Sequence, residues 1–195
     1  MEIILATSNR EKLTEFSQLF ANTEFEIVPQ SKFNVPEALE TGLTFIENAL
    51  IKARNACEYT NKPVIADDSG IVVDALEGAP GVHSARYANK NATYKENRDF
   101  LLKNLKNIPA EKRTARFHCV LVYMRFSCDP MPIVCEGTWE GIILDQEHGD
   151  NGFGYDPVFF VPTHNCSAAE LPFEVKNEIS HRGQALRKMI SFLIP

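Results

Sequence analysis

Two adjacent carboxylates, Asp67 and Asp68, lie inside an apolar run of the sequence, in the segment PVIADDSGIVV at residues 63–73. Charged groups in a buried segment lose their hydration, so we expect them either at a solvated turn or against a positive partner. We therefore predict that a strand ends at Asp68, that the chain breaks there as far as Gly70, and that the two acids hold a metal ion. The alternative is an Asx-type turn that happens to contain two acids.

The ion that suits this segment is a hard divalent cation such as Mg²⁺, which takes oxygen ligands and commonly uses one or two carboxylates together with substrate phosphates. Glu37 and Glu40 precede a predicted helix and are candidate partners of Asp68. Lys52 lies inside that helix, on the face of Asn48 and Asn55 that we expect to be turned away from the apolar stripe. A solvated lysine is the ordinary interpretation of that position.

A candidate phosphate site precedes the first predicted helix, in the segment ATSNREK at residues 6–12. Ser8 and Glu11 stand three residues apart, which is the spacing of a capping box. The unpaired N–H groups of a helix N-terminus, with Lys12 on its first turn, suit an anion such as a phosphate. A well-capped surface helix is the alternative.

Two further segments could bind a flat ring. In NGFGYDP, residues 151–157, Gly152 and Gly154 would let the backbone approach a ligand closely, and Phe153 could offer the face of its ring. In SHRG, residues 180–183, His181 and Arg182 begin a predicted helix. The alternatives are a hairpin loop with buried aromatic residues and a His–Arg pair on the surface. Taken together, the segments at loops and element ends indicate a phosphorylated ring with a metal, which is a nucleotide.

The elements that must position these residues change along the chain: strands and helices alternate in its first part, and strands pair with each other in its later part. Strand-like runs occupy residues 2–7, 63–67, 71–76, 114–126, 131–144 and 157–162, and helices are expected over 8–20, 44–60, from 93 and from 180. Capping boxes at Thr44 with Glu47 and at Thr93 with Glu96 begin two of the helices. The stripe expected to face the core of the helix at 44–60 consists of Ile46, Leu50, Ala53 and Cys57.

The connections are also predicted. Residues 78–88 form a loop rich in glycine and proline, and the runs 114–126 and 131–144 form an antiparallel hairpin around SCDP. This order of elements favours an α/β or α+β fold with a mixed sheet.

Composition excludes several classes of protein. The net charge of -6 argues against a nucleic-acid partner, which usually needs an excess of lysine and arginine. The five cysteines include no CxxC pair, which is typical of reduced thiols in a cytoplasmic protein. No apolar run approaches the roughly 18 residues of a membrane span, and there is no P-loop, dinucleotide, GxSxG or HExxH motif.

The blocks ATSNREK, ETGLTFIENALIKA, ADDSG, GAPGVHSARYA, ARFHCVLVY, GFGYDPVFF and ISHRGQAL resemble those of the inosine triphosphate pyrophosphatase family, in order and over nearly the whole chain. The resemblance implies hydrolysis of ITP, dITP or XTP to the monophosphate and pyrophosphate. It also implies one domain over residues 1–195, an α/β fold with an elongated mixed sheet flanked by helices in two lobes around a central cleft, a homodimer and a cytoplasmic location.

The resemblance further assigns roles to individual residues. Asp68 would be the general base that activates water, Glu40 and Asp68 would bind Mg²⁺, and Asp67 would support them. The phosphates would contact Thr7, Ser8, Asn9, Arg10, Glu11, Lys12, Lys52 and Ser69. The base would contact Phe153, Gly154, Tyr155, Asp156, Lys176, His181 and Arg182.

Specificity is expected from donors such as Lys176 and Arg182, which suit the C6 oxygen of hypoxanthine or xanthine and not the amino group of adenine. Ser8 departs from the glycine that many relatives have, which puts fine phosphate affinity in doubt. Two alternatives are a nucleotide-binding module without turnover and a metal-dependent phosphatase acting on another metabolite.

Overall fold

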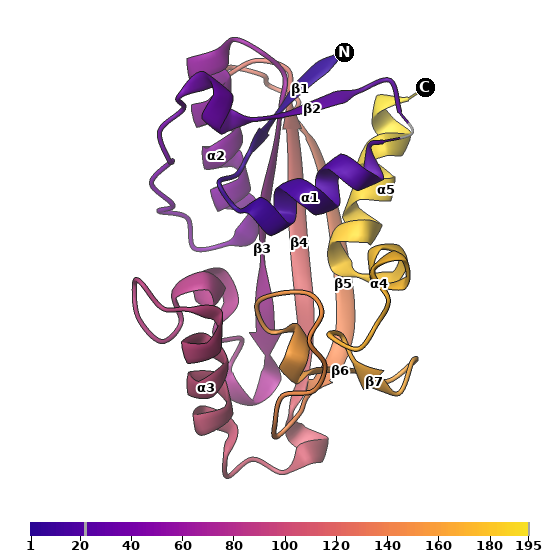
Figure 1. Ribbon diagram of the computed structural model, residues 1–195. Helices are drawn as coiled ribbons and strands as arrows, with labels where there is room; N and C mark the ends of the chain where they lie inside the picture. The colour runs from indigo at the N-terminus through magenta and orange to yellow at the C-terminus, as the bar shows by residue number, and fades with distance from the viewer. Residues whose placement is uncertain (22, 195) are drawn as a thin grey trace. The chain divides into compact units, whose positions relative to one another are not determined.

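The computed structural model describes residues 1–21 and 23–194 as one open sheet with flanking helices (Figure 1). The seven strands follow the order β2-β1-β3-β4-β5-β6-β7. β1 pairs in parallel with β2 and β3, whereas β6 pairs antiparallel with β5 and β7. The predicted α/β class with a mixed sheet is confirmed.

The elements have the following bounds. The strands are β1 Glu2–Ala6, β2 Glu26–Pro29, β3 Val64–Val73, β4 Thr114–Met124, β5 Ile133–Ile143, β6 Phe159–Val161 and β7 Cys166–Ser167. The α-helices are α1 Arg10–Leu19, α2 Phe45–Thr60, α3 Tyr94–Leu105, α4 Phe173–Ile179 and α5 His181–Leu193. Short 3₁₀ helices cover Gln30–Phe33, Asp74–Leu76, Gly81–Arg86, Ala110–Lys112 and Asp156–Val158.

The chain divides into two compact units, each with its own core. Unit 1 comprises Met1–Asp68, Cys119–Gly137 and Arg182–Pro195, and unit 2 comprises Ser69–His118 and Thr138–His181. Within the described residues, no helix is both long and apolar enough to cross a membrane.

In unit 1, the strands separate two apolar clusters because successive side chains of a strand point to opposite faces. Ile65 of β3 packs with Phe16 of α1 and Leu186 of α5. Val64 and Ala66 pack with the residues of the opposite cluster, which include Ala49, Ala53 and Ala56 of α2. By the same alternation, the Asp67 side chain lies on the face of the sheet that α1 and α5 cover, and the Asp68 side chain lies on the face that α2 covers.

The predicted break in the strand is wrong. β3 continues through Asp67, Asp68 and Gly70 without interruption, so an Asx-type turn is excluded as well. An acid can remain inside a strand where a cation from another element meets it, and local sequence does not show such a partner.

The predicted capping box at Ser8 and Glu11 is also wrong. Asn9 is the N-cap of α1, and its side chain accepts a hydrogen bond from the backbone N–H of Lys12 at 2.9 Å. Asparagine is at least as good a cap as serine, so the cap lies one residue later than predicted and the helix begins at Arg10. The boxes at Thr44 with Glu47 and Thr93 with Glu96 are both confirmed.

The predicted stripe of α2 is confirmed in part: Ala53 and Cys57 are buried and Leu50 packs against the same cluster, but Ile46 does not belong to the buried face. Ile46 is 37% exposed, whereas Asn48 is fully buried beside the alanines. Alanine adds little to an apolar pattern, yet its small side chain lets a helix approach a sheet closely. Because the buried face of α2 includes Asn48, it lies closer to Lys52 than the predicted stripe does, and Lys52 points toward the interior rather than toward solvent.

In unit 2, α3 packs Leu101 and Leu105 against Phe117, Trp139 and Phe159. The loop predicted over residues 78–88 contains a short 3₁₀ helix, Gly81–Arg86. The expected strands at 114–126, 131–144 and 157–162 and the final helix are present, and β4 and β5 are neighbours in the sheet. β2, β7 and α4 had not been predicted.

Candidate functional site

Asp67 lies at the centre of a buried charged group in unit 1, which we call the Asp67 cluster and which comprises Lys12, Glu15, Asp67, Cys119 and Arg182. The Lys12 ammonium donates to Asp67 Oδ1, and Arg182 Nε donates to Asp67 Oδ2 at 2.9 Å. The Cys119 thiol also donates to Oδ2, at 3.4 Å, and Arg182 Nη1 donates to Glu15. Both oxygens of Asp67 are therefore occupied by partners.

The charge of Asp67 is stabilised in spite of its burial. Burial alone would raise its pKa, but Lys12 and Arg182 outweigh that effect and hold the pKa of Asp67 well below its usual value. The same contacts raise the pKa of the Arg182 guanidinium against its own desolvation. Asp67 is thus a fixed anion that holds α1 and α5 against β3, and it is a poor acceptor for a proton.

Asp68 belongs to a second group in unit 1, the Asp68 cluster, which comprises Glu40, Lys52 and Asp68. Lys52 Nζ donates to Asp68 Oδ1 at 2.6 Å and to Glu40 Oε1 at 3.1 Å. The Lys52 side chain is only 15% exposed, so it is not the solvated lysine of the ordinary interpretation. Glu37, the other candidate partner, is exposed.

The second oxygen of Asp68 differs from the first. Asp68 Oδ2 is buried and has no hydrogen-bond partner among the described residues. Burial raises the pKa of Asp68 above its usual value, and the neighbouring Lys52 opposes that shift without cancelling it. Burial would lower the pKa of Lys52, but the two carboxylates raise it. A buried carboxylate with a free oxygen and a raised pKa is suited to accept a proton or a metal.

The Asp68 cluster fits a small hard cation. One ammonium nitrogen contacts both carboxylates, which shows that a cation at that position reaches Glu40 and Asp68 together. The described residues contain no group of three or more His, Cys, Asp or Glu side chains able to hold a metal. Mg²⁺ often uses only one or two carboxylates, with water and substrate phosphates as its other ligands, so two acids suffice.

The predicted phosphate-binding residues begin at the end of β1. Asn9 N donates to Thr7 Oγ1 at 3.2 Å, which forms a small turn before the cap of α1. Ser8, Arg10 and Glu11 are exposed, and Lys12 is half-buried because it reaches Asp67. The structure thus brings Lys12 to the Asp67 cluster, and Lys52 to the Asp68 cluster on the other face of β3. Ser69, the next residue of β3, belongs to unit 2.

In unit 2, three of the predicted base-binding residues and one residue that was not predicted, Tyr94, form what we call the Phe153 cluster, which comprises Tyr94, Phe153, Asp156 and Lys176. Asp156 Oδ2 accepts from Phe153 N at 2.8 Å and from Lys176 Nζ at 2.6 Å. The Lys176 ammonium lies 5.0 Å from the centre of the Phe153 ring. The loop therefore has an aromatic ring with a cation over its face, which places a hydrogen-bond donor close to any flat ring with an acceptor oxygen that binds there.

Glycine is required at position 152. Its φ is +74°, and a Cβ there would collide with the carboxylate of Asp156. The neighbouring Tyr155 is buried, and its hydroxyl donates to Ser84 O at 2.8 Å. Tyr155 therefore anchors the loop, while Phe153 remains half-buried.

His181 and Arg182, adjacent in sequence, have different surroundings. The His181 ring stacks on Phe117 at 4.8 Å with an angle of 10° between the planes, within unit 2. The Arg182 guanidinium lies in the Asp67 cluster of unit 1. The pair is buried, so it is not surface decoration. The assignment of Arg182 to the base stays a prediction, since the contacts shown here are to carboxylates.

Four residues of these clusters and contacts were not predicted from the sequence: Glu15, Cys119, Phe117 and Tyr94. Glu15 lies three residues after Lys12 on α1, and this i, i+3 spacing could have indicated a shared face. The other three offer no local signal, because their partners lie far away along the chain.

Comparisons with known proteins agree over nearly the full length. The family model described as the Ham1 family matches residues 3–192. A protein of Vibrio vulnificus (strain YJ016) named dITP/XTP pyrophosphatase is 56% identical over 192 residues, which cover 98% of this chain and 96% of that protein.

Solved structures show the same similarity. A HAM1 protein from Coxiella burnetii has a TM-score of 0.93 and 49% identity, covering 99% of this chain and 98% of that one. The Ham1 protein of Staphylococcus aureus has a TM-score of 0.88 and 40% identity, again covering 99% and 98%.

Proposed function

The chain belongs to the Ham1 family, and we propose that it hydrolyses the non-standard purine nucleotides dITP, XTP and ITP to the monophosphate and pyrophosphate. Curated relatives that are 53% to 56% identical over 192 residues are named dITP/XTP pyrophosphatases. The observation that carries the proposal within this chain is the buried Asp68 carboxylate, which has one oxygen without a hydrogen-bond partner in the described part of the chain.

Asp68 acts as the general base in this proposal. A water that attacks the α-phosphorus must lose a proton, and a carboxylate with a raised pKa accepts it more readily than an ordinary one. Lys52 holds the carboxylate through Oδ1, which leaves Oδ2 for the water or a metal. Asp67 does not compete for this role, because Lys12 and Arg182 keep its pKa low.

Glu40 and Asp68 would hold the metal, for which we propose Mg²⁺. When bound, the ion would offset the negative charge of the triphosphate beside the two acids and polarise the phosphate that is attacked. The side chain of Glu40 is 27% exposed, so it combines access to solvent with contact to Lys52.

The phosphates would bind the segment from Thr7 to Lys12, together with Lys52 and Ser69. The N-terminus of α1 provides backbone donors and a favourable dipole. Lys12 and Lys52 supply ammonium groups that are already desolvated in part, each with a side chain 15% exposed.

The base would contact Phe153, Gly154, Tyr155, Asp156, Lys176, His181 and Arg182. Lys176 is the donor best supported for the C6 oxygen of hypoxanthine or xanthine, because its ammonium lies beside the Phe153 ring. Adenine would leave such a donor facing an amino group, and a buried donor left unpaired costs about 1–3 kcal/mol.

We also propose that residues 1–195 act as a single catalytic domain, that the protein is a homodimer and that it works in the cytoplasm without a nucleic-acid partner. All five cysteines are free thiols, in keeping with a reducing compartment. Light scattering of the purified protein tests the dimer directly.

Product analysis tests the function. Purified protein is incubated with dITP, XTP, ITP, dGTP or ATP in the presence of Mg²⁺, and the products are separated. We expect one pyrophosphate for each dIMP, XMP or IMP, with slow turnover of ATP. Release of orthophosphate from ITP would instead support a phosphatase, and tight binding without products would support a nucleotide-binding module.

A further inference from the structure

The loop that carries Phe153 and Gly154 connects β5 to the 3₁₀ helix Asp156–Val158. Near its two ends, Leu144 N donates to Val158 O at 2.8 Å and His148 N donates to Pro157 O at 2.9 Å. Its tip contains Gly149, Gly152 and Gly154, all with positive φ. Glycines in this region add conformational freedom, so the position of the tip depends on its contacts, which include Asn151 N to Ala169 O at 3.0 Å and Phe153 N to Asp156 Oδ2 at 2.8 Å.

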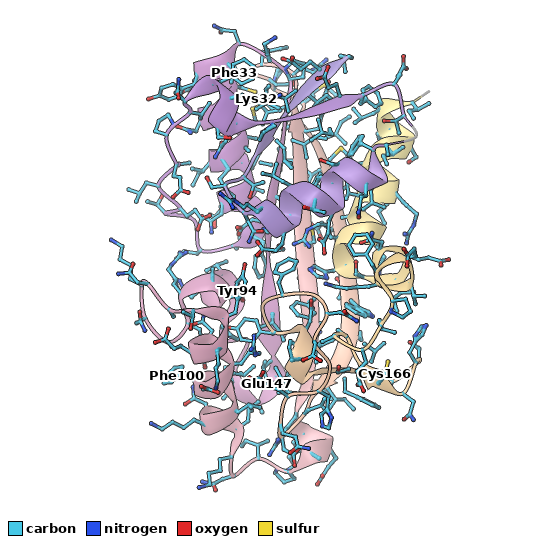
Figure 2. All side chains as sticks on the ribbon, in the orientation of Figure 1. Lys32, Phe33, Tyr94, Phe100, Glu147 and Cys166 are labelled. Carbon is cyan, nitrogen blue, oxygen red and sulfur yellow. The ribbon has the colours of Figure 1, made fainter. Side chains whose placement is uncertain are left out.

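Arg98 of α3 supplies two further contacts, one before the tip and one at Gly154 within it. Its Nη1 donates to Gly154 O at 2.9 Å, and its Nη2 donates to Glu147 Oε2 at 3.0 Å. Arg98 Nε lies 3.0 Å from Glu147 Oε1 as part of the same ion pair. The planar guanidinium therefore ties residue 147 to residue 154, and both of them to α3. Figure 2 labels Glu147 and, on α3, Tyr94 and Phe100.

α3 is a firm support for these contacts. Its capping box at Thr93 and Glu96 fixes its beginning. Asn97 is 1% exposed, and its amide donates to Ala85 O at 3.0 Å and accepts from Ala88 N at 2.9 Å. Arg98, the next residue, has a side chain only 13% exposed, so it is ordered by packing as well as by hydrogen bonds.

Tyr94 reinforces the same connection one turn earlier. Residues at i and i+4 share a helix face, and the Tyr94 ring lies 6.0 Å from the Phe153 ring with an angle of 43° between the planes. α3 thus contacts two consecutive loop residues, Phe153 through Tyr94 and Gly154 through Arg98.

We propose that Arg98 is a positioning residue for purine recognition: its hydrogen bond to Gly154 O holds the Phe153 ring in the orientation that stacks on the base. This inference rests on the proposed function. The side-chain contacts of Arg98 among the described residues are with Gly154 and Glu147, and neither residue belongs to the Asp68 cluster. Its loss should therefore weaken binding of the base more than it slows chemistry, which appears as a higher KM with a nearly constant kcat.

Three variants and a control separate positioning from stability. Arg98→Met removes both contacts. Glu147→Gln neutralises the ion pair but leaves Arg98 free to hold Gly154 O. The double variant Arg98→Glu/Glu147→Arg restores an ion pair with reversed charges, yet a glutamate cannot donate to a carbonyl. The control is Asp99→Asn, which breaks the exposed Lys95–Asp99 pair on the same helix and removes neither hydrogen bond of Arg98.

For dITP, we expect Arg98→Met to raise KM about 10-fold, the size expected for one charge-assisted hydrogen bond, with kcat changed less than about 3-fold. The double variant should recover thermal stability but keep the high KM. Glu147→Gln and Asp99→Asn should stay within about 3-fold of the wild type. An unchanged KM in Arg98→Met, or a KM restored in the double variant, would overturn the proposal.

Hydrogen exchange of the unliganded protein tests the inference without a substrate. Arg98→Met should speed the exchange of amides in residues 149–155 and leave that of the α3 amides unchanged. Equal exchange of residues 149–155 in the wild type and in Arg98→Met would refute the proposal that Arg98 holds the loop. A wild type that turns over none of the purine nucleotides would refute the proposed function alone, because the exchange measurement would still decide the role of Arg98.

Discussion

Asp67 and Asp68 are neighbours on one strand, yet they meet opposite environments. Asp67 has partners on both oxygens, among them two cations, and its pKa lies well below the usual value. Asp68 has one cation on one oxygen, a second oxygen with no partner in the described chain, and a raised pKa. The alternation of side chains along β3 produces this difference, because it turns one acid toward α1 and α5 and the other toward α2.

The comparison teaches how to separate structural from chemical acids. A fully satisfied buried carboxylate holds elements together and has little capacity to change its bonds. A buried carboxylate with an unused oxygen retains the capacity to bind a proton or a cation. We therefore assign fold stability to Asp67 and chemistry to Asp68, and the predictions below test that division.

Metal removal should lower catalytic activity, which we assign to Asp68, and leave the stability of the fold unchanged. Chelation with EDTA should lower the rate of dITP hydrolysis by about a thousand-fold or more, since a metal contributes several kcal/mol to such a reaction. Added Mg²⁺ should restore it. The midpoint of urea unfolding without nucleotide should change little, because the Asp67 cluster uses no metal. Undiminished hydrolysis after complete chelation would contradict the proposed role of Glu40 and Asp68.

Asp67→Asn should be the most destabilising change in the comparison. It leaves Lys12 and Arg182 buried without their shared carboxylate, and losing one partner of a buried ion pair costs about 3–5 kcal/mol. Urea denaturation measures this loss in the free energy of unfolding. Asp74→Asn is the matched control, because Asp74 and Arg116 form a partly exposed pair, with side chains 42% and 31% exposed. Asp74→Asn should lower the free energy of unfolding by no more than about 1 kcal/mol. Equal losses in Asp67→Asn and Asp74→Asn would contradict the structural role assigned to Asp67.

The contribution of Asp67 should depend on pH in a defined direction. Its pKa is lowered in the folded state, so its stabilisation is present above the unfolded value of about 3.9 and is lost as pH falls further toward the folded value. The difference in unfolding free energy between wild type and Asp67→Asn should therefore be constant near neutral pH and shrink below about pH 4. A difference that grows on acidification would refute this assignment.

Lys52→Met should change catalysis through Asp68, by less than metal removal does. Lys52 lowers the pKa of Asp68 against the effect of burial, so its removal should raise that pKa and move the acid limb of the kcat/KM profile to higher pH. At neutral pH, kcat/KM should fall about 10-fold, since a charged hydrogen bond is lost. Lys62→Met is the control, because Lys62 pairs with the partly exposed Glu2. A shift of the limb to lower pH would contradict the assignment of the base.

Much of the framework was predictable from local patterns. Thr44 and Thr93 begin helices because their capping boxes satisfy backbone groups within four residues. The helix expected from residue 180 is present as α5, His181–Leu193. The failures have different causes. The cap of α1 was misplaced because Asn9 competes locally with Ser8. A break in the strand was predicted at Asp67 and Asp68 because the local sequence does not show the cations from other elements that stabilise the two acids.

The candidate site was predictable in composition but not in arrangement. Lys52 was expected in solvent because the alanines that turn α2 toward the sheet add little to an apolar pattern. Arg182 was assigned to the base, and only the folded chain shows its contacts with Asp67 and Glu15. Spacing along the sequence identifies residues able to do chemistry, whereas their partners depend on packing between elements.

The measurement that tests the central claim most directly is the turnover of dITP by Asp68→Asn at saturating Mg²⁺, alongside its urea unfolding. We predict a kcat lower by about 10²–10⁴, the usual contribution of a general base. The unfolding free energy should fall less than in Asp67→Asn, because Lys52 keeps Glu40 as a partner and the charge that is removed from Asp68 is one that burial disfavours. Pyrophosphate release near the wild-type rate by the folded variant would contradict the account.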